Sequence, residues 1–180
     1  MANTYVQIGS TVTVGSGGAS SIDFTSIPNT YTDLLVKVSG RSSRNEFVAT
    51  YLTMQLNSAT TNYTYRTLDG IPGVSIGSGT QANYTTSAIV VGALSQTNST
   101  ASTFGSSEIY IPNYAGSTNK SISAEGVSEN NATSTVLIMT AGLWSDTSAI
   151  TSISLKPFVG GSFFNFTQYS TASLYGIKKS

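Results

Sequence analysis

The chain has 180 residues and no net charge, because eight basic residues are balanced by eight acidic residues. It contains neither histidine nor cysteine, which excludes imidazole bases, thiolate nucleophiles, zinc centres with Cys or His ligands, and disulfides. Only 9 % of the residues are charged, against about 25 % in ordinary soluble domains. We therefore expect no electrostatic binding to nucleic acid.

Uncharged polar residues dominate the composition, with 30 Ser, 26 Thr and 12 Asn. A disordered stalk is excluded because the apolar fraction is 39 %, with ten Tyr and seven Phe, and only four Pro occur. No apolar run reaches the 18 or so residues that a membrane span needs. Residues 1–10 also lack the basic start and apolar run of a secretory signal. We expect one folded domain over residues 1–180.

Apolar residues recur at every second position in many segments, which predicts strands with one buried face. Residues 1–19 are expected to form an N-terminal arm or an edge strand. The clearest alternating segments, in chain order, are residues 6–14, 34–39, 51–56, 108–111 and 152–155.

Two further segments, residues 87–94 and 136–144, are apolar at nearly every position. This pattern is typical of strands that are covered on both faces. The second covering can come from the middle of a sheet under loops, or from an interface between identical subunits. The sequence leaves both explanations open.

Turn residues separate the predicted strands at short intervals. Residues 129–132 lie between two extended runs and predict a hairpin loop, whereas residues 69–84 show no clear period. Eight to ten short strands at this spacing predict an all-β fold, an antiparallel β-sandwich, with a jelly roll as the expected arrangement.

The sequence has few side chains that could catalyse a reaction or bind a phosphate group or a metal ion. Carboxylates are the remaining candidates for acid–base catalysis, and the closest pair in sequence, Glu125 and Glu129, flanks the predicted hairpin, where carboxylates are usually solvated. Glycine-rich residues 15–18 and 77–79 are not followed by a helical pattern that would bind phosphate. We expect no enzyme activity, no cofactor and no metal site.

Aromatic residues are the better candidates for binding. A groove of tyrosine rings and amide groups would suit a neutral sugar or a protein partner, and edge packing is the simpler alternative. The candidate partner or glycan contacts are Tyr63, Tyr65 and Tyr84. A second set is expected at a subunit interface: Val136, Ile138, Trp144, Phe163 and Phe164.

Four strings of the sequence resemble small structural proteins of tailed bacteriophages. They are SIDFTSIPNTYTDLLVKVSGRSS (residues 21–43), FGSSEIYIPNYAGSTNKSISAEG (104–126), AGLWSDTSAITSISLKP (141–157) and STASLYGIKKS (170–180). The resemblance implies a jelly-roll module on the virion surface, made in the host cytoplasm. It consists of strand and turn residues, so it assigns no catalytic or binding residue.

The resemblance and the composition together predict a non-enzymatic virion structural protein, most specifically a capsid decoration (cement) protein. Such a protein would form a homotrimer and contact the major capsid protein or other virion proteins. The alternative is a tail-fibre or receptor-binding module that recognises a host glycan. A polysaccharide-degrading enzyme is a third hypothesis, which depends on the carboxylates alone.

Overall fold

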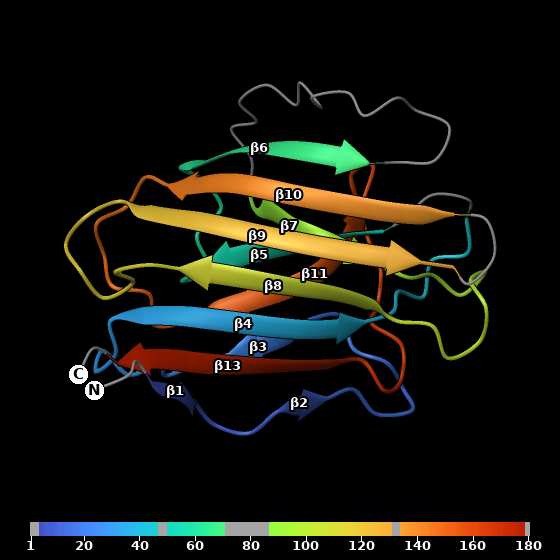
Figure 1. The fold of residues 1–180 in the computed structure, drawn as a ribbon, viewed down its shortest axis with the longest axis horizontal. Helices are drawn as coiled ribbons and strands as arrows, with labels where there is room; N and C mark the ends of the chain where they lie inside the picture. The colour runs from blue at the N-terminus through green and yellow to red at the C-terminus, as the bar shows by residue number, and fades with distance from the viewer. Residues whose placement is uncertain (1–3, 47–49, 71–86, 131–133, 179–180) are drawn as a thin grey trace.

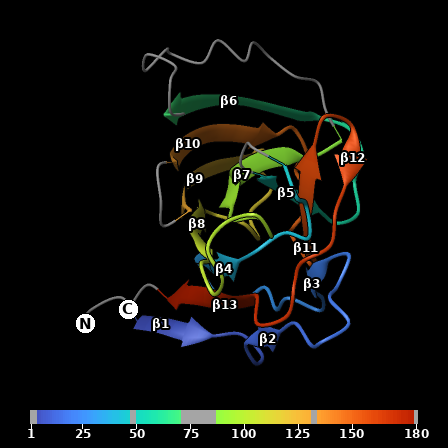
Figure 2. The same ribbon diagram turned by 90° about the vertical axis from the view of Figure 1, so that its right-hand side faces the viewer.

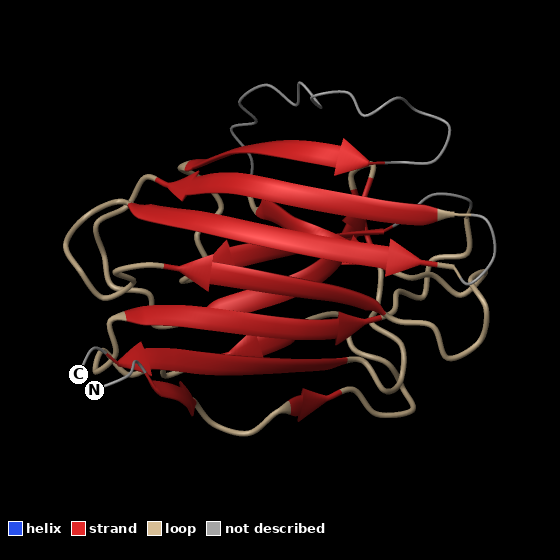
Figure 3. Cartoon of the chain, in the orientation of Figure 1, coloured by secondary structure: helices blue, strands red, loops and turns tan. Residues whose placement is uncertain are grey.

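A computed structural model describes residues 4–46, 50–70, 87–130 and 134–178. Within these ranges the chain forms thirteen strands and no helix (Figure 3). No helix long and apolar enough to cross a membrane is found in the part of the chain that the structure describes.

The strands form two sheets that lie face to face (Figures 1 and 2). Every pairing between named strands is antiparallel. The large sheet has the order β1 (Thr4–Gln7), β13 (Thr171–Lys178), β4 (Asp33–Gly40), β8 (Gly105–Ile111), β9 (Lys120–Glu129), β10 (Thr135–Trp144) and β6 (Tyr63–Gly70), and β2 (Val12–Thr13) also pairs with β13. The small sheet has the order β12 (Ser162–Phe163), β11 (Ile153–Val159), β5 (Thr50–Leu56) and β7 (Ile89–Leu94), and β3 (Ile22–Phe24) also pairs with β11.

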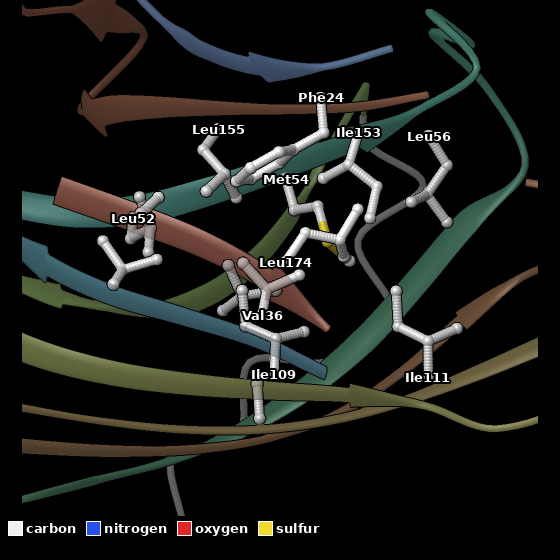
Figure 4. Packing of buried hydrophobic residues seen from close by; sticks show 14 of the residues in the cluster. Phe24, Val36, Leu52, Met54, Leu56, Ile109, Ile111, Ile153, Leu155 and Leu174 are labelled. Carbon is white, nitrogen blue, oxygen red and sulfur yellow. The ribbon is translucent and has the colours of Figure 1, made fainter. Parts of the chain in front are cut away.

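The main core fills the space between the sheets (Figure 4). The large sheet contributes residues such as Val36, Ile109 and Leu174, and the small sheet contributes residues such as Leu52 and Leu155, all fully buried. Each such side chain contributes about 1.5–3 kcal/mol by its removal from water. The two-residue alternation therefore predicts correctly which faces of β4, β5, β8 and β11 are buried.

The predicted antiparallel sandwich is confirmed, and the jelly-roll arrangement stays a prediction. The structure has more strands than the eight to ten expected because β2, β3 and β12 are only two or three residues long. Such short strands leave no readable period in a sequence. Of the N-terminal segment, β1 and β2 lie at the edge of the large sheet beside β13.

The strand β7 is buried on both faces, as its apolar sequence predicts. One face belongs to the main core, and on the other Val90 and Ala93 pack against Val136 and Ile138 of β10. The covering of β7 therefore comes from its own chain. In β10, by contrast, buried and exposed residues alternate from Thr135 to Ala141.

The two sheets approach each other closely where β7 passes behind β9 (Figure 1). A Cβ atom on Gly126 would lie 2.6 Å from the Cα atom of Gly92 and 2.7 Å from Oγ of Ser107. Such distances are shorter than carbon atoms tolerate, so glycine is required for this contact between the sheets.

We predict that Gly126→Ala lowers the free energy of unfolding by about 1–3 kcal/mol, because the added methyl group forces backbone atoms apart. Gly17→Ala is the matched control, since no atom lies within 4 Å of its Cβ position and its φ is not positive. It should change stability by less than about 1 kcal/mol. Urea denaturation of both variants measures the difference, and equal stabilities would contradict the close contact.

Candidate association surface

Tyr63 lies in the core rather than in a surface groove. Its side chain is fully buried, and its ring stacks on Trp144 with centroids 6.2 Å apart and an interplanar angle of 23°. Its hydroxyl accepts a hydrogen bond from the backbone N–H of Leu56 at 2.8 Å and donates one to the carbonyl of Leu56 at 3.1 Å. Because the hydroxyl and the ring are occupied within the chain, Tyr63 has no surface to offer a ligand.

Of the other two candidate tyrosines, Tyr65 alone lies among the described residues, and it does not complete a surface groove with Tyr63. Tyr65 is half-buried and packs against the apolar residues between the sheets. Tyr84 lies outside the described residues. The predicted contact at Tyr84 therefore stays a prediction, whereas Tyr63 and Tyr65 belong to the inner side of β6.

Three of the five residues predicted for a subunit interface point into the sandwich. Val136 and Ile138 pack against β7, and Trp144 stacks on Tyr63, so their own chain covers them. An interface on β10 would have to use the intervening residues instead.

The two phenylalanines of that set lie at the opposite sheet. Phe163 on β12 is 57 % exposed, and its ring centroid is 5.1 Å from that of Phe158. Phe164 is half-buried beneath the guanidinium of Arg44, which lies 5.8 Å from the ring centroid. Of the predicted interface set, Phe163 is thus the one side chain that is exposed rather than buried or half-buried.

An exposed apolar patch lies on the outer face of the large sheet, the face turned away from the small sheet. Its members are exposed by 40–49 % and come from three adjacent strands: Leu68 on β6, Leu137 and Met139 on β10, and Val127 on β9. Leu68 pairs directly with Met139, and Val127 pairs directly with Leu137. The four side chains therefore form one continuous surface, which we call the apolar patch.

Charged residues border the apolar patch. Glu125 on β9 pairs with Met139 on one side and with Glu108 on the other. Glu108 forms an ion pair with Lys37 at 2.9 Å, and the hydrogen bond within this pair raises the pKa of Lys37. No ion pair to Glu125 occurs among the described residues. Two carboxylates thus face each other across β8 and β9, and only one of them has a cation.

Two shallow depressions cross the outer face. One, of about 570 Å³, is lined by the apolar pair Leu68 and Met139 together with Glu125 and Tyr110. The other, of about 400 Å³, is lined by Tyr5, Leu35, Lys37, Glu108 and Tyr175. Glu108 lines both depressions, so they adjoin on the sheet.

The carboxylate pair that the sequence suggested for catalysis is widely separated on β9. Glu125 and Glu129 both project from the outer face of β9, and four residues along a strand span about 13 Å. Glycoside hydrolysis uses carboxylates about 5–9.5 Å apart. Among the described residues, no group of three acidic side chains is placed to hold a metal ion.

The sequence contained a signal for the apolar patch, because residues 136–144 are apolar at both odd and even positions. Odd and even positions of a strand lie on opposite faces, so one of the two sets must face outward in any sheet with a single core. The sequence suggested Val136 and Ile138 for an interface, but these residues lie on the inward-facing side of β10, because the core also requires apolar residues. No signal in the sequence brings Leu68 next to Met139, because their pairing depends on the order of the strands.

Comparisons with protein-family models, with curated proteins and with solved structures found no match to this chain.

We predict that Tyr63→Phe lowers the free energy of unfolding by about 1–3 kcal/mol, because it leaves the buried N–H of Leu56 without its acceptor. Burial raises the pKa of the Tyr63 phenol, so its stabilising contribution is complete below the unfolded value near pH 10 and is lost as the pH rises through the folded value. The stability difference between wild type and variant should therefore narrow above about pH 10.

Chemical denaturation across a pH series measures this difference, and the other tyrosines titrate alike in both proteins. A difference that widens above pH 10, or no difference at neutral pH, would contradict the buried hydrogen bonds of Tyr63.

Proposed function

We propose that the chain is a non-enzymatic structural protein of a bacteriophage virion that acts through surface association, most specifically as a capsid decoration protein. The phage assignment comes from the sequence resemblance alone. The association role rests on the apolar patch. The jelly roll is an expectation of the resemblance, and the homotrimer is an expectation from the apolar strand at residues 136–144, with a twofold dimer as the alternative assembly.

The apolar patch is the observation that carries the association role. Scattered exposed apolar residues are normal on protein surfaces, whereas the largest contiguous apolar patch of a protein is often functional. Leu68, Met139, Leu137 and Val127 are contiguous by strand register. Burial of these four side chains against a partner would remove apolar area from water, which is the main favourable term in association.

A second observation in favour of the association role is that the loops at one end of the sandwich are held in place by hydrogen bonds within the chain. The guanidinium of Arg41 donates hydrogen bonds to the carbonyls of Thr97, Ser99, Thr100 and Thr103, at 2.9–3.2 Å. One side chain thereby ties the segment before β8 to the end of β4. A module that is already ordered loses less conformational entropy when it binds.

The proposed mechanism is stabilisation by mass action. A protein that binds the assembled shell, but not its separated subunits, shifts the equilibrium toward the shell in proportion to its concentration and affinity. This mechanism requires neither a nucleophile nor a cofactor. It requires an accessible surface that keeps its shape.

The receptor-binding alternative has an observation of its own. Tyr5, exposed by 59 %, and the half-exposed Tyr175 line a depression with Lys37 and Glu108. Tyrosine rings beside charged hydrogen-bonding groups suit the apolar faces and hydroxyls of a sugar. If the glycan alternative holds, this depression is a better location than the buried Tyr63.

The copy number of the chain in purified virions separates the two functions. For a decoration protein we expect a copy number proportional to the number of capsomers, and binding of the purified chain to empty heads. Quantitative mass spectrometry and co-sedimentation with heads measure these. A few copies confined to isolated tails would contradict decoration and favour receptor binding, and absence from the particle would contradict both.

A further inference from the structure

We propose that the outer face of the large sheet binds the outer face of a second copy of this chain about a twofold axis, with Arg66 of each copy paired with Glu125 of the other. The inference names a partner for the apolar patch, and it rests on the proposed function only in treating that patch as an association surface.

Arg66 lies on the outer face of β6 and its side chain is exposed. Its guanidinium has no hydrogen bond, ion pair or aromatic contact to any of the described residues, unlike the other described basic side chains. Lys37, for example, pairs with Glu108, and Arg41 donates to four carbonyls. The described residues thus leave the guanidinium donors of Arg66 open to a partner.

Glu125, on β9, lies beside another carboxylate and has no cation beside it among the described residues. It is exposed, it lacks an ion pair among the described residues, and it faces Glu108 directly across β8 and β9. Like charges at paired positions of neighbouring strands are destabilising. A cation brought by a partner would relieve this repulsion, whereas Lys37 is already engaged by Glu108.

Arg66 and Glu125 lie on either side of the apolar patch. Arg66 pairs with Ala141, and Glu125 pairs with Met139, so the two charges lie on opposite sides of β10. They are one two-residue step apart along the strand direction. The surface thus carries a positive and a negative group on either side of an apolar centre.

Such a surface is complementary to itself. A twofold axis that runs along β10 in the plane of the interface exchanges the positions of β6 and β9. It brings Arg66 of one copy over the neighbourhood of Glu125 in the other and places Met139 near Met139. Packed sheets lie about 10 Å apart, a distance that extended Arg and Glu side chains from the two faces can span together.

The size of the surface predicts the strength of the dimer. The four strands β8, β9, β10 and β6 present an area about 14 Å wide and 24–34 Å long, or roughly 400 Å² for each copy. Stable interfaces bury about 800 Å² on each partner. The dimer should therefore be weak, with a Kd in the micromolar to millimolar range, and become significant where many copies are held close together.

The test is sedimentation velocity of the purified chain at low ionic strength, up to about 1 mM. We expect a monomer–dimer equilibrium for the wild type. Arg66→Glu and Glu125→Arg should each raise Kd by about tenfold or more, because each places like charges at both symmetric contacts. The double variant Arg66→Glu with Glu125→Arg should return Kd to within about threefold of the wild type.

Two further variants complete the design. Met139→Asp should abolish dimerisation, because it puts a charge at the centre of the apolar patch. Lys156→Glu is the matched control on the small sheet and should leave Kd unchanged, and thermal unfolding verifies that each variant is folded. A wild-type chain that stays monomeric or forms a trimer, or charge variants that the double exchange does not restore, would overturn the proposal.

These outcomes are separate from those of the proposed function. A chain that dimerises but does not bind heads retains the twofold contact and loses the decoration role. A chain that binds heads but never dimerises retains the decoration role and loses the twofold contact.

Discussion

The alternation of side chains along β9 and β10 is the constraint on which the surface of this molecule depends. In β9 every second residue from Lys120 to Ser128 is buried, and the residues between them are exposed. The same alternation in β10 turns Val136 and Ile138 inward and Leu137 and Met139 outward. Because the inward residues of β9 pack in the main core and Val136 and Ile138 of β10 pack on β7, the outward residues of both strands are held in a defined array. The apolar patch follows directly from this register.

Small residues keep that array in place from beneath. Gly92, Gly126 and Ser107 let β7 lie directly on β8 and β9, so the outer face has a backbone layer close behind it. The buried ring pair of Tyr63 and Trp144 supports the other end of β6 and β10. A surface supported in this way changes little on binding, and its affinity is then set by the side chains that it exposes.

Much of the fold can be predicted from the sequence because its period is simple. Strands such as β8 and β11 bury every second residue, and the two-residue period identifies that face. The hairpin between β9 and β10 is also predictable, since its two strands pair from Glu129 and Thr135 onward. Of the predicted loop at residues 129–132, Glu129 is the last residue of β9, and residues 131 and 132 lie outside the described residues. Strands of two or three residues were not, because a period needs more positions than they have.

The surface was harder to predict, for a different physical reason. When the odd and the even positions of a strand are both apolar, the sequence indicates that both faces avoid water. It does not indicate which face packs against the core of its own chain. The pairing of Arg66, Met139 and Glu125 across three strands is also invisible in the sequence, since it depends on β10 lying between β6 and β9. Strand order is a property of the whole fold, and it determines which distant residues become neighbours.

Two methionines allow a direct test of the central claim that the outer face is the association surface. Met139 lies in the apolar patch and is 48 % exposed, whereas Met54 is fully buried between the sheets. Methyl NMR of methionine-labelled protein over a concentration series therefore compares the two sites in one sample. The account predicts that the Met139 signal shifts or broadens as concentration rises while the Met54 signal stays constant. A Met139 signal that does not change up to about 1 mM would contradict it.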